Sequence, residues 1–420
     1  MRLFVTVSLG VAIAAPVSLI APFNTPVDAQ SLDELVRQGQ AALAAQDYPR
    51  AEAIWWQVLE LDPANALAYD NLGIALYEQG QYADSETAHR QALELAADNA
   101  DFHNNLGIAL YAQERYEEAA TAYQQALDLE PDPVFYENLG LAQYEQGQFS
   151  EAEMAFRQAL ELDPDHADTY NNLGRTLAEL GRHEEAEDAY HQALALEINF
   201  IFYDNLGITL TELGRYEEAE TVHRKALQLE PEDALSHLNL GIALYEQDRY
   251  VEAEAAFRES LRLNPEDPNG HNNLALTLAD QGRYEEAEVA HRQALQLGSN
   301  FIFYDNYGQL LSLLGRYEEA GTAHSRALQI APNDALTHTN LGIALAGQER
   351  YEEAEAAHQR ALALNPNNPE IYNNLGYLYQ TQGQLQEAIE LYQQALELNP
   401  EFTPAQNNLT AAQELLGPSK

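Results

Sequence analysis

Apolar residues recur along the chain with the period of an amphipathic helix, and short polar turns interrupt them. In residues 335–368, the apolar positions of the first half fall on one helical face. A polar Gln-Glu-Arg turn follows, and the helical period resumes at Tyr351. Pro366 should end the second helix, because proline lacks a backbone N–H and clashes with the preceding turn. This pattern predicts two helices joined by a short turn.

The same pattern returns every 34 or 33 residues, which predicts a solenoid in which each repeat packs only on its neighbours. Each predicted repeat has small residues where its two helices should cross, including glycines 39, 73, 107, 140, 174, 207, 241, 308, 342 and 376; Ala275 takes this position once. The predicted repeats, numbered 1 to 11, are 32–65, 66–99, 100–132, 133–166, 167–199, 200–233, 234–267, 268–300, 301–334, 335–368 and 369–402. Residues 30–402 are thus expected to form one array, with 403–420 as a C-terminal capping helix.

The spacing of Tyr136, Leu139-Gly140, Ala152, Phe156 and Pro164 resembles the tetratricopeptide repeat (TPR), and Ala159 fits the same pattern. The match recurs eleven times over residues 32–402. This resemblance implies an all-α fold, a right-handed superhelical solenoid of helix-turn-helix units. It also implies a protein-binding role.

Residues 1–29 differ from the repeats. Arg2 precedes an apolar run, prolines follow, and Val27 and Ala29 provide small residues at cleavage-site offsets. We interpret this segment as a secretory signal peptide. A membrane anchor is the alternative, but prolines interrupt the segment before the roughly 20 apolar residues that a spanning helix needs. The expected location is periplasmic, in a thylakoid lumen, or extracellular, with no stable membrane anchor after cleavage.

The formal net charge of −46 argues against nucleic-acid partners, whose phosphates an acidic surface would repel. The chain has no cysteine, so disulfides and thiolate metal sites are excluded. No phosphate loop, metalloprotease motif or nucleophile elbow is present. We therefore expect no enzyme activity, no catalytic residue, no cofactor and no metal.

Nine of the twelve histidines occupy the two aromatic positions of the repeat: His103, His237, His271 and His338 in first helices, and His89, His223, His291, His324 and His358 in second helices. Three pairs are 14 residues apart, such as His89 and His103. Two imidazoles rarely suffice for a metal site. We expect both members of each pair to be buried and mostly neutral, substituting for Phe or Tyr in the core.

In the TPR family the first helices line a concave groove. Carried over to this chain, the groove positions in repeats 2 to 4 hold Asp70, Ile74, Tyr77, Glu78, Asn104, Ile108, Tyr111, Glu137, Leu141, Tyr144 and Glu145. No other three consecutive repeats keep the tyrosine. Amides and carboxylates beside tyrosine can hold a peptide backbone and basic side chains, although the same residue types also occur in such repeats without a ligand. Some family members bind a C-terminal carboxylate with Lys and Arg on this face. In this chain the fifth residue of each repeat is never basic, so that clamp is missing.

The resulting hypothesis is a non-enzymatic interaction scaffold, an assembly or adaptor factor that binds a basic or apolar segment of a protein. Two alternatives stay open. One is an envelope-polysaccharide-binding or export accessory protein, with tyrosines stacking on sugars. The other is an architectural rod that assembles end to end. The sequence does not indicate an oligomeric state.

We predict cleavage between Ala29 and Gln30, because small residues precede this bond and Ser31-Leu32-Asp33-Glu34 is a helix-capping pattern just after it. N-terminal sequencing of exported protein should begin at Gln30. A mature chain that keeps residues 1–29 would instead identify the segment as an anchor.

Overall fold

The computed structural model describes residues 31–417, so the predicted signal segment 1–29 lies outside the described residues. Within this range the fold is entirely helical, as predicted. The described residues divide into two compact parts, one ending at Leu229 and the other starting at Glu230. No helix in residues 31–417 is long and apolar enough to cross a bilayer.

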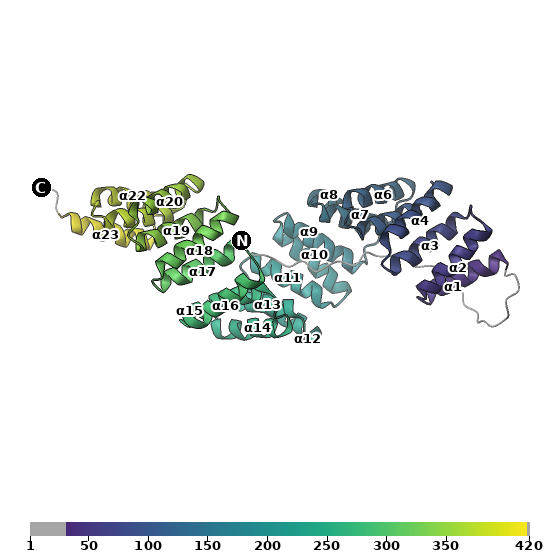
Figure 1. Ribbon diagram of the computed structural model, residues 1–420, viewed down its shortest axis with the longest axis horizontal. Helices are drawn as coiled ribbons and strands as arrows, with labels where there is room; N and C mark the ends of the chain where they lie inside the picture. The colour runs from purple at the N-terminus through teal and green to yellow at the C-terminus, as the bar shows by residue number, and fades with distance from the viewer. Residues whose placement is uncertain (1–30, 418–420) are drawn as a thin grey trace. The chain divides into compact units, whose positions relative to one another are not determined.

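The N-terminal part contains twelve helices (Figure 1). Their bounds are α1 Leu32–Ala44, α2 Tyr48–Leu61, α3 Ala66–Glu78, α4 Tyr82–Leu95, α5 Ala100–Tyr111, α6 Tyr116–Leu129, α7 Pro133–Glu145, α8 Phe149–Leu162, α9 Ala167–Glu179, α10 His183–Leu196, α11 Phe200–Glu212 and α12 Tyr216–Leu229.

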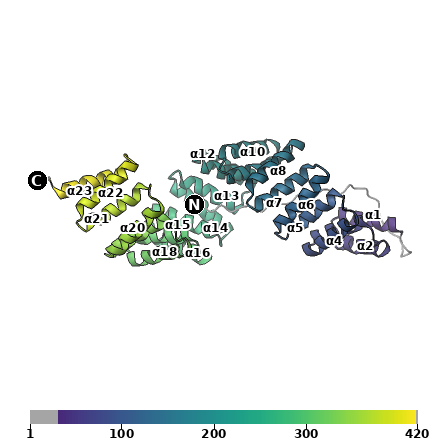
Figure 2. The ribbon, with the colours of Figure 1, turned by 90° about the horizontal axis from the view of Figure 1, so that it is seen from above.

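The C-terminal part contains α13 Ala234–Tyr245, α14 Tyr250–Leu263, α15 Pro268–Asp280, α16 Tyr284–Leu297, α17 Phe301–Leu313, α18 Tyr317–Ile330, α19 Ala335–Gly347, α20 Tyr351–Leu364, α21 Pro369–Thr381, α22 Leu385–Leu398 and α23 Thr403–Leu416. In both views the labelled helices follow one another in chain order within each part (Figures 1 and 2).

First helices of neighbouring repeats contact one another inside each part. Helix α3 contacts α1 and α5, and α7 contacts α5 and α9, whereas within the described N-terminal part no second helix contacts the second helix of the next repeat. The first helices are therefore closer together than the second helices, which makes their side the inner one.

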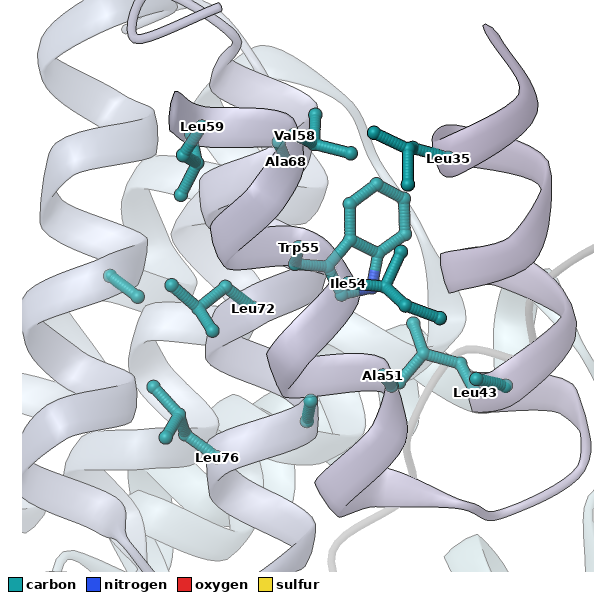
Figure 3. Close-up of a cluster of buried hydrophobic side chains, with 13 residues drawn as sticks. Leu35, Leu43, Ala51, Ile54, Trp55, Val58, Leu59, Ala68, Leu72 and Leu76 are labelled. Carbon is teal, nitrogen blue, oxygen red and sulfur yellow. The ribbon is translucent and has the colours of Figure 1, made fainter. Parts of the chain in front are cut away.

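Each helix pair closes around one aromatic or imidazole ring, carried by the second helix and facing the eighth position of the repeat. A Cβ on Gly174 would lie 2.7 Å from the ring of Tyr190, and one on Gly107 would lie 2.5 Å from the ring of Tyr123. The eleven residues in this ring position are Trp55, His89, Tyr123, Phe156, Tyr190, His223, Phe257, His291, His324, His358 and Tyr392. Figure 3 shows the first of them, Trp55, surrounded by Leu35, Ile54 and Val58.

The five histidines in this ring position are at most 2% exposed. In His89, His223 and His324 the Nδ1 atom lies 2.8 Å from the carboxylate of an aspartate 19 residues earlier, Asp70, Asp204 and Asp305 respectively. His291 and His358 have no such partner, and burial lowers the pKa of each to about 4. His291 and His358 belong to none of the three predicted pairs, so the predicted neutral state of the pairs stays a prediction, whereas the burial of their second-helix members is confirmed.

The first-helix histidines are only half-buried, contrary to expectation. Each ring bonds a backbone carbonyl six residues earlier, as His103 Nε2 does with the Ala97 oxygen at 2.9 Å and His338 Nε2 with the Pro332 oxygen at 3.1 Å. The two imidazoles of a pair thus have separate hydrogen-bond partners, and the expected burial of the first-helix member is wrong.

We predict that Gly174→Ala lowers the midpoint of thermal unfolding, measured by circular dichroism. Alanine should gain about 1 kcal/mol from helix propensity, but its Cβ would meet the buried Tyr190 ring at 2.7 Å, and such overpacking costs about 1 to 3 kcal/mol. The reverse change at the same position of repeat 8, Ala275→Gly, is the control and should also destabilise, through the propensity term and the loss of a buried methyl group. A more stable Gly174→Ala variant would contradict the ring contact.

We predict that His358→Phe reduces the loss of stability on acidification. Because burial lowers the pKa of folded His358 to about 4, the unfolded chain binds a proton below about pH 6.5 while the folded chain does not. The contribution of neutral His358 to the free energy of unfolding is therefore complete above about pH 6.5 and is lost as the pH falls toward 4. Thermal unfolding of wild type and variant at several pH values measures it. The exposed His191→Gln is the control, and equal slopes for wild type and His358→Phe would contradict the prediction.

Candidate functional site

Three tyrosines lie near the C-terminal ends of the first helices α3, α5 and α7: Tyr77, Tyr111 and Tyr144. Each is half-buried, and each ring packs on the first aromatic residue of the following helix, with centroid separations of 5.3, 5.1 and 5.3 Å. Burial raises the pKa of all three hydroxyls. The rings are therefore held in place from one side and partly open on the other.

The predicted aliphatic row beside these tyrosines is mostly inside the fold. Ile108 and Leu141 are buried, and only Ile74 keeps some exposure. Ile108 and Leu141 therefore offer little surface to a ligand.

The fifth-position residues Asp70, Asn104 and Glu137 are also buried, because each accepts hydrogen bonds from an asparagine of the next repeat. Asn105 Nδ2 donates to both oxygens of Asp70 at 3.1 and 3.2 Å. The corresponding bonds to Asn104 and Glu137 measure 2.9 and 3.3 Å. Burial raises the pKa of Glu137, an effect that His166, 3.7 Å away, opposes. These polar groups join successive repeats instead of facing outward.

Glu78 and Glu145 are exposed at the ends of α3 and α7. Their negative charge acts on the neighbouring tyrosines. Burial is the largest cause of the raised pKa of Tyr48 and of Tyr111, and the second cause is Glu78 for Tyr48 and Glu145 for Tyr111. The tyrosine row therefore has accessible carboxylates along its edge.

Sequence reasoning missed Arg175 on α9. Its guanidinium carbon lies 4.7 Å from the ring centroid of Tyr144, a cation–π contact. It is the only lysine or arginine on any first helix from α3 to α21. The signal was present in the sequence, since Arg175 takes the place that Ile74, Ile108 and Leu141 hold in the preceding repeats.

A shallow depression opens beside Tyr77, lined by Ile74, Tyr77, His89, Asn105 and Ile108. Three of these residues, Ile74, Tyr77 and Ile108, were predicted to belong to the site. His89 is an addition, and it comes from the second helix α4. Of the predicted site residues, only those of α3 and α5 take part in it.

Most arginines of the turns and second helices are engaged in ion pairs. Arg115 bridges Glu118 at 2.7 Å and Glu86 at 2.5 Å, joining two repeats, and Arg182 and Arg283 repeat the arrangement. Burial raises the pKa of Glu86, but hydrogen bonds from Gln113, Arg90 and Arg115 outweigh it and lower that pKa overall. Most of the scarce positive charge is thus used within the fold, and the acidic excess stays on the surface.

A tetratricopeptide repeat profile matches residues 36–88, 71–133, 138–198 and 205–268. Further TPR profiles match 303–334, 347–383 and 369–402. No curated protein sequence matches the chain.

Among solved structures, the APC/C hetero-tetramer Cut9–Hcn1 is similar, with a TM-score of 0.52 and 15% identity over 91% of this chain and 97% of that chain. Pseudomonas aeruginosa pilF gives a TM-score of 0.43 and 27% identity over 48% of this chain and 93% of that chain. YrrB, a TPR protein with an unusual peptide-binding site, gives a TM-score of 0.36 and 22% identity over 44% of this chain and 96% of that chain. The first of these likenesses shows a shared fold.

Proposed function

This chain belongs to the tetratricopeptide repeat family, and from that premise we propose that it is a non-enzymatic scaffold outside the cytoplasm. It binds an extended segment of a protein partner along the first helices α3, α5 and α7. TPR folds typically serve protein–protein interaction. The choice of this segment of the array, and of a peptide ligand, is our proposal.

The observation that carries the proposal is the row of Tyr77, Tyr111 and Tyr144. Each ring is fixed by an aromatic neighbour at 5.1 to 5.3 Å and is still partly accessible. Such preorganised tyrosines offer broad contact area at low entropic cost, which is the character of binding hot spots. Their spacing follows the repeat, so a ligand that contacts all three must run across successive helices.

The charges favour a segment with basic as well as apolar side chains. Glu78 and Glu145 are exposed beside the rings, and the arginines that could neutralise them are largely paired elsewhere. Arg175 already lies over Tyr144. A basic side chain of the partner therefore fits better near Tyr77 and Tyr111 than near Tyr144.

Placement outside the cytoplasm rests on the signal-like sequence of residues 1–29. The acidic surface suits an assembly or adaptor factor there, since it attracts basic segments over several ångströms and speeds their encounter. Added salt should therefore slow association, while the tyrosines determine how long the complex lasts.

We predict that changing Tyr77, Tyr111 and Tyr144 together to Ala weakens binding more than a hundredfold, at roughly 1 to 2 kcal/mol for each hot-spot tyrosine. The probe is a peptide selected from a phage-displayed random library on the protein from residue 30 onward, and its Kd is measured by calorimetry. Helicity should change little, because the rings are only half-buried.

Tyr245→Ala is the matched control, since Tyr245 occupies the same position in repeat 7 and packs on Tyr250 at 5.5 Å. It should leave the Kd unchanged. Binding that survives the triple change but is lost with Tyr245 or Ile302 would move the site to the central repeats. Capture of a sugar polymer, with no peptide selected, would favour the polysaccharide alternative.

A further inference from the structure

The depression beside Tyr77 has a polar atom at its base. Ile74 and Tyr77 of α3 and Ile108 of α5 give it apolar walls, and the polar residues that line it are Asn105 of α5 and His89 of α4. The imidazole is 98% buried, with 2% exposed. A depression with apolar walls and one nitrogen acceptor or donor at its base is the arrangement of a side-chain subsite.

The hydrogen bonds around His89 define which nitrogen is open. Asp70 accepts from Asn105 Nδ2 on both oxygens, at 3.1 and 3.2 Å, and its Oδ1 lies 2.8 Å from His89 Nδ1. A carboxylate that only accepts requires Nδ1 to carry the proton and donate it. The Nε2 atom of His89 is not engaged by Asp70, and the described residues show no other hydrogen bond to it.

The equivalent histidine of repeat 9 differs from His89 in the exposure of its Nε2 atom. His324 makes the same 2.8 Å bond to Asp305, but its Nε2 atom is sealed from solvent and unpaired. Gln309, at the position of Ile74, bonds Asp305 Oδ2 at 2.9 Å and so lies against the pair. Repeat 6 has Ile208 at that position, yet Nε2 of His223 is sealed as well, so an isoleucine there does not by itself open the nitrogen; Nε2 of His89 is not among the sealed atoms. The open depression is thus a property of repeat 2.

We propose that this depression is the subsite for a threonine or serine side chain of the bound segment, whose hydroxyl forms a hydrogen bond with His89 Nε2. The inference rests on the peptide-binding function proposed above and specifies one residue of the ligand. Threonine fits because its hydroxyl satisfies the nitrogen and its methyl group contacts Ile74 and Ile108. A lysine ammonium could also donate, but it would lose its hydration among two isoleucines and a tyrosine.

The test uses the phage-selected peptides and a double-mutant cycle. Peptides that need the tyrosines should share a Thr or Ser at one position. Replacing that residue by the similarly shaped Val, or by Ala in the case of Ser, should weaken binding about tenfold, the usual effect of one hydrogen bond. In Asp70→Asn/His89→Phe the two peptides should bind equally.

That variant should fold, since Asn occupies the position of Asp70 in repeats 3 and 5 and Phe the position of His89 in repeats 4 and 7. The matched control is Asp305→Asn/His324→Phe, in which the tenfold difference should remain. Nitrogen-15 NMR of the imidazole in the native protein gives an independent measurement, and it should show the proton of His89 on Nδ1.

Several results would overturn the subsite. Tyrosine-dependent peptides without a shared Ser or Thr would do so, as would a Thr-to-Val difference that persists in Asp70→Asn/His89→Phe, or a proton on Nε2 alone. In each case the proposed peptide-binding function survives. Failure to select any peptide that needs the tyrosines would remove both proposals.

Discussion

The contact between a ring of the second helix and a glycine of the first determines the rest of this structure. A Cβ at Gly140 would lie 2.7 Å from the ring of Phe156, and ten of the eleven repeats lack that atom, while repeat 8 accommodates Ala275 beside His291. Close approach in turn leaves the ring no room except between its own repeat and the next. Each ring therefore fills the interior of one repeat and forms part of the surface on which the following repeat packs. Stability then accumulates from neighbour to neighbour.

The same contact explains why polar residues can be buried in the inner helices. A ring that is an imidazole brings nitrogen atoms into the core, and these need partners. In three repeats the partner is an aspartate of the first helix, and asparagines of the next repeat supply further bonds where the structure describes them, as Asn105 does for Asp70 and Asn340 for Asp305. Where the repeat has Tyr123 or Tyr190 instead, the residue in the aspartate's place is an asparagine, and it still accepts from the next repeat. One polar connection between repeats is thus kept while the chemistry of the ring varies.

The fold could be predicted from the sequence because its determinants are local and repeated. Gly, Ala and Pro at constant spacing predict helix, turn and helix, and the period predicts the stacking. The candidate site could be predicted only in part. Tyr77, Tyr111, Tyr144, Glu78 and Glu145 are accessible as expected, but Asp70, Asn104 and Glu137 are buried by partners 34 or 35 residues away. Single-repeat spacing does not reveal such partners, although the asparagine that follows each fifth position could have suggested them. Arg175 and the opening above His89 likewise depend on which residue a neighbouring repeat provides.

The distribution of charge follows from which positions of the repeat are needed for packing. The inner helices are occupied by ring contacts and amide bonds, so nearly all arginines lie in turns and second helices, where they join repeats through pairs such as Arg115 with Glu86. These side chains are partly exposed, and each pair alone contributes little in water. Their larger effect is to remove positive charge from the reach of a ligand. With 67 acidic and 21 basic residues in the chain, the carboxylates that remain outnumber any available cation. For a ligand bound as we propose, this surrounding field would repel acidic segments before contact, and the side chains of repeats 2 to 4 would distinguish among the rest.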